Sequence, residues 1–150
     1  MDNADVIDEL NTLIETSKDG EYGFLSCAEH VKSTSLREVF AQRAADCRQA
    51  ASELQQLVRQ HGGKPEDEGS TGGTLHRGWV AVKATLTGYS DKAMLEECER
   101  GEDVAVARYR KAAQKDLPAG VMEVVQRHLA GALRNHDQIK LLRDQARNAA

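Results

Sequence analysis

The sequence predicts an all-α protein that folds as one antiparallel four-helix bundle. Only 2 of the 150 residues are proline and 4% are aromatic, while Ala, Leu, Glu, Gln, Arg and Lys, which favour helices, are abundant. Apolar residues recur at alternating spacings of four and three in four separate stretches, as expected when each helix buries one side. With 40% hydrophobic residues, a chain of this length can bury a core as a single domain, residues 1–150.

The first helix is predicted over residues 5–31. Its apolar side is formed by residues spaced four and three apart, namely Val6, Leu10, Leu13, Ser17, Gly20, Phe24, Cys27 and Val31. Glu21 lies in a second row beside these residues. It is therefore at the edge of the apolar side, where an acidic residue is less usual than on the exposed side. Gly20 and Gly23 have no side chains, which would let another helix or a ligand come close.

The second helix is predicted over residues 35–61. Ser35, followed three residues later by Glu38, matches a capping box, and Gly62 with Gly63 marks the end of the helix. Arg43 interrupts the apolar side of this segment. The short break before residue 35 requires the first two helices to form an antiparallel hairpin.

A long connection separates the two halves of the chain. Residues 62–73 are rich in Gly, Ser, Glu and Asp with no apolar periodicity, so we expect a mobile connection there. Residues 74–87 have helical spacing and predict a short extra helix, in which Trp79 serves as a packing anchor.

The third and fourth long helices are predicted over residues 91–114 and 119–146. Glu102 lies on the side of the third helix that is otherwise apolar, where a carboxylate needs a partner. The apolar side of the fourth helix is interrupted by His128, Asn135 and His136.

The two predicted hairpins resemble each other in sequence. When the two hairpins are aligned at their Gly-Glu pairs, Glu21 corresponds to Glu102 and Arg43 corresponds to His128. Counting back from each turn at about 1.5 Å per residue puts these residues near the middle of the bundle. We therefore expect a polar layer across the core, to which Cys47 and Asn135 also belong.

Charge and composition exclude several classes of protein. A net charge of −4 and a pI near 5.7 argue against a nucleic-acid partner. The acidic N-terminal residues do not form a signal peptide, and no apolar run is long enough to span a membrane. We expect a cytoplasmic protein with no membrane partner.

The three cysteines, Cys27, Cys47 and Cys98, lack the CxxC spacing of zinc fingers and thioredoxins. Buried reduced thiols are the simplest interpretation. A redox-sensitive cluster in the core is the alternative.

Three stretches carry a resemblance to known proteins: Lys18-Asp19-Gly20-Glu21 within residues 14–24, Leu75-His76-Arg77-Gly78-Trp79, and Glu99-Arg100-Gly101-Glu102-Asp103 within residues 95–103. The chain resembles the ferritin-like superfamily and, more narrowly, an uncharacterised bacterial family called domain of unknown function 2383. The resemblance covers nearly the whole chain. It implies a ferritin-like antiparallel four-helix bundle with a long crossover between the second and third helices, but no established activity.

Diiron sites of ferritin-like proteins combine one Glu from each of two helices with Glu-x-x-His from each of the other two. Glu21 and Glu102 can stand for the two single glutamates. The Glu-x-x-His motif is missing, because Val125 precedes His128 and Leu133 precedes His136 at the required spacing. The resemblance therefore implies a degenerate diiron site.

Ion pairs could replace the metals at such a site. On this hypothesis Arg43 neutralises Glu21, and His128 or His136 neutralises Glu102. A layer of this kind would fix how the helices align more than it would stabilise the fold.

The sequence leaves three functions open. The first is a non-catalytic bundle without a cofactor that acts through self-association, with a homodimer favoured, or through binding another protein; analogy with ferritin-like proteins adds a stress-related role. The alternative is a protein that binds iron, zinc or manganese through Glu21, Glu102 and either His136 or His128. The third is a ligand carrier whose cavity is lined by Gly20, Gly23, Phe24 and Tyr109. No catalytic triad or phosphate-binding loop is present, so no catalytic residue is assigned.

Overall fold

The computed structural model describes residues 1–67 and 89–149, which form four long helices. They are α1 (Asn3–His30), α2 (Thr34–Gln60), α3 (Asp91–Ala113) and α4 (Ala119–Asn148). These two ranges contain no strand, so the all-α prediction is confirmed, and each predicted helix agrees with the structure to within two residues at either end. The predicted short helix over 74–87 and its Trp79 lie outside the described residues.

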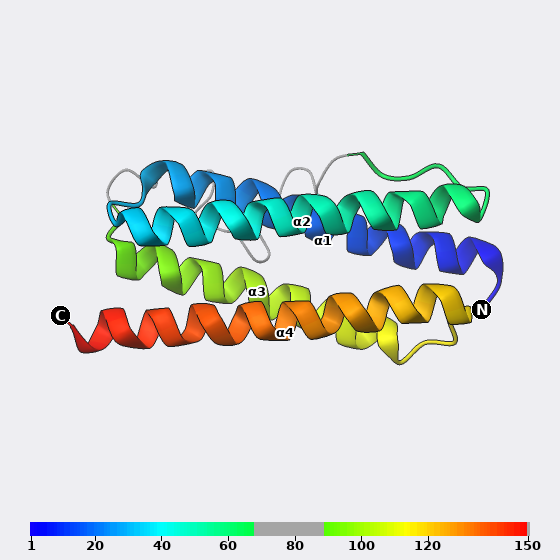
Figure 1. Cartoon of the computed structure of the whole chain (residues 1–150). Helices are drawn as coiled ribbons and strands as arrows, with labels where there is room; N and C mark the ends of the chain where they lie inside the picture. The colour runs from blue at the N-terminus through cyan, green and yellow to red at the C-terminus, as the bar shows by residue number, and fades with distance from the viewer. Residues whose placement is uncertain (68–88, 150) are drawn as a thin grey trace.

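The helices are arranged as two antiparallel hairpins stacked on each other (Figure 1). One hairpin is α1 with α2 and the other is α3 with α4. The hairpins meet mainly through α1 and α3, whereas α2 and α4 pack much less closely. The two termini lie at opposite ends of the bundle.

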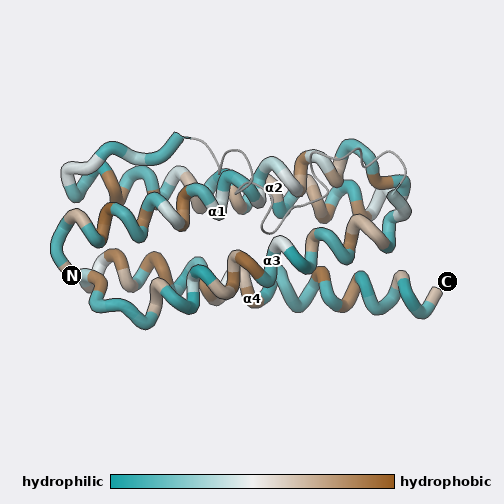
Figure 2. The backbone as a smooth tube through the Cα atoms, turned by 180° about the vertical axis from the view of Figure 1, so that it is seen from behind, coloured by the Kyte–Doolittle hydropathy of each residue, from teal (hydrophilic) through white to brown (hydrophobic). Residues whose placement is uncertain are grey.

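Each helix is amphipathic, which is why the hairpins stack. Figure 2 shows hydrophobic residues at short intervals among hydrophilic ones along all four helices. None of the helices in the described part of the chain combines the length and the apolarity needed to cross a membrane.

The turn between α1 and α2 is fixed by the start of α3. The carboxylate of Asp91 accepts hydrogen bonds from the backbone N–H groups of Lys32 and Ser33 at 2.9 and 3.0 Å. Ser33 is thereby held as the N-cap of α2, and its Oγ accepts a hydrogen bond from the N–H of Leu36 at 3.3 Å. The predicted cap at Ser35 was wrong, because that residue is already helical.

The chain after α2 turns back onto the first hairpin. Gly62, with a φ of 80°, supplies the left-handed conformation that ends the helix. The side chain of Asn11 then accepts a hydrogen bond from the N–H of Glu66 at 2.9 Å, and Gln55 donates one to the carbonyl of the same residue at 2.9 Å. The first residues of the predicted connection are therefore fastened to α1 and α2.

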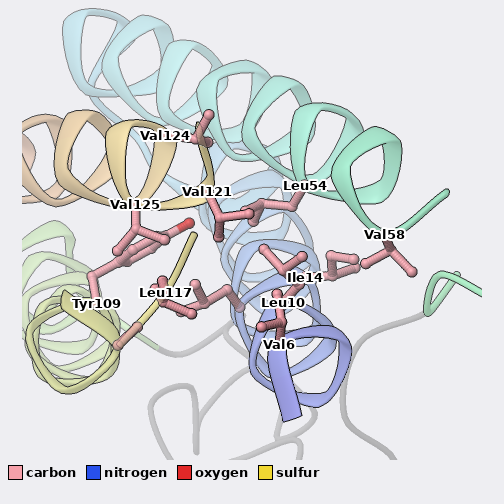
Figure 3. Packing of buried hydrophobic residues seen from close by; sticks show 12 residues of the cluster. Val6, Leu10, Ile14, Leu54, Val58, Tyr109, Leu117, Val121, Val124 and Val125 are labelled. Atoms are coloured by element: carbon pink, nitrogen blue, oxygen red, sulfur yellow. The ribbon is translucent and has the colours of Figure 1, made fainter. Parts of the chain in front are cut away.

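The hydrophobic core consists of two clusters, one towards each end of the bundle. The cluster near the α1–α2 turn contains Phe24, Cys27, Ala28, Val31, Phe40, Ala44, Met94, Leu95, Cys98 and Ile139. In the other cluster, side chains from α1, α2 and α4 point towards one another, with Tyr109 and Leu117 beside them (Figure 3). It contains Val6, Leu10, Leu13, Ile14, Leu54, Val58, Tyr109, Ala112, Leu117, Val121, Val124 and Val125. Buried Ser17 and Glu102 fall between the two clusters along α1 and α3.

Candidate functional site

A cleft of about 430 Å³ lies between the two hydrophobic clusters and is lined by all four helices. Its space comes from small residues, which include Gly20, Ala50, Gly101, Ala105, Gly131 and Ala132. The polar and ionisable side chains on its walls include Ser17, Cys47, Glu53, Glu102, Tyr109 and His128. A cleft with convergent polar groups is the kind of place where a small ligand binds.

Glu102 of α3 is the most unusual residue of this cleft. Its relative exposure is only 6%, and its Oε1 has no hydrogen-bond partner among the residues described. Burial raises the pKa of Glu102 to about 8; nearby Arg43 opposes this shift, while Asp103 and Asp46 add to it. The carboxyl group is therefore mainly protonated at neutral pH.

A chain of hydrogen bonds runs along another wall of the cleft, from α1 to α2. The distances are 3.4 Å between Ser17 Oγ and the Tyr109 hydroxyl, 3.2 Å between that hydroxyl and His128 Nδ1, and 2.7 Å between His128 Nε2 and Glu53 Oε1. Arg127 donates to both carboxylate oxygens of Glu53.

The directions of these bonds follow from the ionisation of Glu53. Hydrogen bonding from Arg127, assisted by His128, lowers the pKa of Glu53 to about 2, so this carboxylate only accepts. Burial lowers the pKa of His128, although Glu53 opposes that shift. A neutral His128 that donates from Nε2 must accept at Nδ1, and Tyr109 is its donor.

Cysteine thiols occupy two places in the middle of the molecule. Cys47 lies so close to Gly20 that a Cβ atom on the glycine would be 2.8 Å from the cysteine Sγ. In the neighbouring cluster, the thiol of Cys98 donates to Cys27 Sγ at 3.7 Å. Burial raises the pKa of both Cys47 and Cys98, so neither is activated as a nucleophile.

The sequence of residues 5–115 matches the family model described as Domain of unknown function (DUF2383). The chain belongs to this family. Among curated proteins, none matches the sequence.

Solved structures show which fold the DUF2383 chain shares. A dodecameric thioferritin, the bacterioferritin-related protein of Bacteroides fragilis, is 18% identical with a TM-score of 0.80, over 99% of this chain and 90% of that one. A ferritin-like diiron-carboxylate protein from Bacillus anthracis is 17% identical with a TM-score of 0.76, over 95% of this chain and 99% of that one. A Dps1 variant from Mycobacterium smegmatis is 16% identical with a TM-score of 0.74, over 93% and 95% of the two chains. The DUF2383 chain is therefore a ferritin-like bundle.

In this DUF2383 protein the four candidate metal ligands do not lie together. Glu102 and His128 line the cleft. Glu21 pairs with Lys18 at 3.7 Å and lines a separate groove between α1 and α2. His136 pairs with Asp103, with 2.5 Å between Nε2 and Oδ1.

The predicted ion pairs were wrong in their partners. Arg43 pairs with Asp46 at 3.5 Å rather than with Glu21. Neither predicted histidine pairs with Glu102, since His128 binds Glu53 and His136 binds Asp103. The cation whose charge acts on Glu102 is Arg43. Of the residues expected in the polar layer, Cys47 and Asn135 both line the cleft.

The residues at the level of the cleft do not fit a diiron centre. Two iron ions ordinarily need about four carboxylates together with histidines, whereas the carboxyl groups on the cleft walls are Asp46, Glu53 and Glu102. Within residues 1–67 and 89–149, no group of three or more His, Cys, Asp or Glu side chains is placed to hold a metal ion.

Glu53 is the ionised cleft residue that the sequence analysis missed. Its signal was present on α2, where Arg43, Asp46, Ala50 and Glu53 follow one another at spacings of three, four and three. That spacing places them on one side of the helix. The side borders the apolar residues and faces the cleft at Asp46, Ala50 and Glu53.

Proposed function

We propose that this protein is a cytoplasmic, non-catalytic bundle that acts through self-association, and that its central cleft descends from a diiron site which it no longer contains. The proposal includes a role in stress physiology, which rests on the analogy with ferritin-like proteins. A dodecameric thioferritin of the same fold supports the expectation of a homo-oligomer.

The observation that carries the proposal is the set of side chains at the cleft. Where two Glu-x-x-His motifs would supply metal ligands, α2 has Arg43 and Cys47, and α4 has His128, which is bound to Glu53. A guanidinium group so near Glu102 supplies positive charge where a diiron site would need carboxylates. This donor set supports a binding or assembly role over iron oxidation.

An exposed apolar surface on the first hairpin supports self-association. Tyr22 and Leu25 of α1 are 49% and 46% exposed, and three residues apart they lie on one side of the helix. The exposed Ala41 and Ala45 lie on α2, and both border the same groove as Leu25. Small residues beside large apolar ones allow a second helix to approach closely, so we assign the interface between copies to this surface.

Light scattering coupled to size-exclusion chromatography tests the self-association. We expect the wild type to elute as a dimer or larger assembly, and Leu25→Glu to elute at a smaller mass because it buries a charge in the interface. Leu141→Glu is the matched control, since Leu141 on α4 is 58% exposed. A monomeric wild type would overturn the proposal, and equal dissociation of both variants would overturn the assignment of the surface.

Metal analysis tests the second part of the proposal. Protein prepared without a histidine tag should contain much less than one iron, zinc or manganese ion per chain, and Glu102→Ala should not change that content. Stoichiometric metal that is lost in Glu102→Ala would instead establish the alternative, a metal-binding protein that uses Glu102 with His128, His136 or Glu21.

A further inference from the structure

We propose that the central cleft binds a small organic cation, a primary amine with an apolar body, and that Glu102 holds its ammonium group. This inference goes beyond self-association and is independent of it, because the cleft and the exposed surface on α1 and α2 share none of the residues that carry either argument.

The first step is the state of Glu102 compared with the other buried glutamate of α3. Glu97 is 5% exposed and Glu102 is 6% exposed. Glu97 accepts hydrogen bonds from both Nε and Nη2 of Arg100, whereas Oε1 of Glu102 has no such partner among the described residues. A buried acceptor is rarely left without a donor, and Glu102 lies on the cleft wall, where a ligand could supply one.

The second step is the balance of charge around Glu102. From α2, Arg43 faces it but also pairs with Asp46, and Cys47 adds a neutral thiol. From α3, Asp103 adds negative charge. From α1, Ser17 lines the cleft and is uncharged. From α4, Arg134 lines the cleft with a positive charge, and His128, a residue whose pKa is lowered by burial, lines it as well.

The remaining acid of the cleft, Glu53, is balanced by Arg127. An ionised Glu102 would therefore be the carboxylate of this cleft with the least compensation. A cation is the ligand that supplies it, because Asp46 and Glu53 are already paired with Arg43 and Arg127, whereas Oε1 of Glu102 has no hydrogen-bond partner among the described residues.

The third step is the shape of the cleft. A volume of about 430 Å³ lies within the range of small-molecule sites. Phe24 and the alanines at 50, 105 and 132 supply apolar wall, so the ligand needs an apolar body behind its charged group.

Calorimetry with three matched probes tests the proposal. Phenethylamine, 2-phenylethanol and 3-phenylpropionate share a ring and differ in the charge of the polar group. We expect the amine to bind one per chain, the alcohol at least about tenfold more weakly, and the carboxylate not at all. Because free Glu102 is protonated at neutral pH, binding the ammonium should release close to one proton, measured at pH 7 in buffers of different ionisation enthalpy.

Three variants assign the effect to the site. Glu102→Gln should abolish amine binding and proton release, since it keeps the shape but cannot ionise. Glu97→Gln is the matched control on the same helix and should bind as the wild type does. Ala105→Leu should lose binding by filling the cleft, with its fold checked by circular dichroism.

Several results would overturn the proposal. Equal affinity for the amine and the alcohol would remove the role of charge. Unchanged binding by Glu102→Gln, or by a folded Ala105→Leu, would place the amine elsewhere, and loss of binding in Glu97→Gln to the same extent as in Glu102→Gln would make the effect a global one. Absence of amine binding would reject the site and would leave self-association untouched.

Discussion

His128 donates a hydrogen bond from Nε2 to Oε1 of Glu53 over 2.7 Å, and so joins α4 of the second hairpin to α2 of the first. Apart from this bond, α2 and α4 pack less closely than α1 with α2, α3 with α4, or α1 with α3. Arg127, one residue before His128, binds the same carboxylate. The pair therefore closes one edge of the cleft and ties together two hairpins that meet mainly through α1 and α3.

Replacing Glu53 should loosen this connection. We expect Glu53→Gln to lower the free energy of unfolding at pH 7 by about 1 kcal/mol, a modest value because the side chain is 36% exposed and its ion pair is screened by solvent. The pKa of Glu53 is lowered to about 2 by Arg127 and His128. The stabilisation is therefore present above the ordinary pKa of 4.5 and is lost as pH falls towards 2.

Urea unfolding of Glu53→Gln and the wild type, at pH 7 and at steps down towards pH 2, measures this difference. Glu29→Gln, an exposed glutamate of α1, is the control and should change stability very little. A difference between Glu53→Gln and the wild type that stays constant over the whole pH range would contradict the assigned role of Glu53.

Glu102 should produce the opposite dependence on pH. Its pKa is raised from 4.5 to about 8 by burial, so between these values the folded state binds more protons than the unfolded state. Stability should therefore fall as the pH rises from 5 to 9. Glu102→Gln removes the ionisable carboxyl group. We expect its free energy of unfolding to exceed that of the wild type by between about 2 and 5 kcal/mol at pH 9 and to equal it near pH 5.

Thermal or urea unfolding between pH 5 and 9 checks this prediction. Gly120→Ala, which adds a Cβ that meets nothing within 4 Å and changes no ionisable group, is the control and should leave the slope with pH as it is in the wild type. If Glu102→Gln retained that slope, another group would be responsible for it.

The sequence was sufficient for the four helices, because they depend on periodicity. Glu102 could be placed on a buried side from its spacing alone, and it is 6% exposed. The partners of polar side chains were harder to predict. His136 lies eight residues after His128, which turns it by roughly 80° around α4, and it meets Asp103 rather than the cleft.

Glu21 shows the second reason for such errors. Its row lies at the flank of α1, and the side chain turns along its own helix to Lys18. Which of several cations a flanking carboxylate meets depends on rotamers and on small offsets between helices. Neither quantity is encoded in the spacing of residues.

The buried thiol pair should be chemically inert in the folded protein. Cys27 and Cys98 are both fully buried, and burial also raises the pKa of the Cys98 thiol. We expect Ellman's reagent at pH 8 to leave both unlabelled in the native state and to label all three cysteines in denaturant. Cys47, which lines the cleft, should account for any slow labelling of the native protein.

Cys47→Ser is the variant that checks this assignment, because it should remove the slow native labelling completely. Rapid native labelling that survives in Cys47→Ser would show that Cys27 or Cys98 is accessible. In that case the cluster formed around Phe24 and Phe40 would open on the timescale of the reaction.

The contact between Gly20 and Cys47 should make two substitutions depend on each other. A Cβ on Gly20 would lie 2.8 Å from Cys47 Sγ, so Gly20→Ala must displace the thiol from its place between α1 and the cleft. We expect this variant to lose roughly 1–2 kcal/mol of stability. Without the sulfur atom the same change should be favourable, because Ala is better than Gly inside a helix by about 1 kcal/mol.

A double-mutant cycle measures this dependence. Urea unfolding of the wild type, Gly20→Ala, Cys47→Ala and the double variant gives the four free energies, and we expect Gly20→Ala to destabilise the protein only when Cys47 is present. Gly120→Ala, where an added Cβ meets nothing within 4 Å, is the control and should not be coupled to Cys47. Additive effects in the cycle would mean that the two helices can move apart at Gly20 without loss of stability. Close packing would then not be the reason why small residues line the cleft.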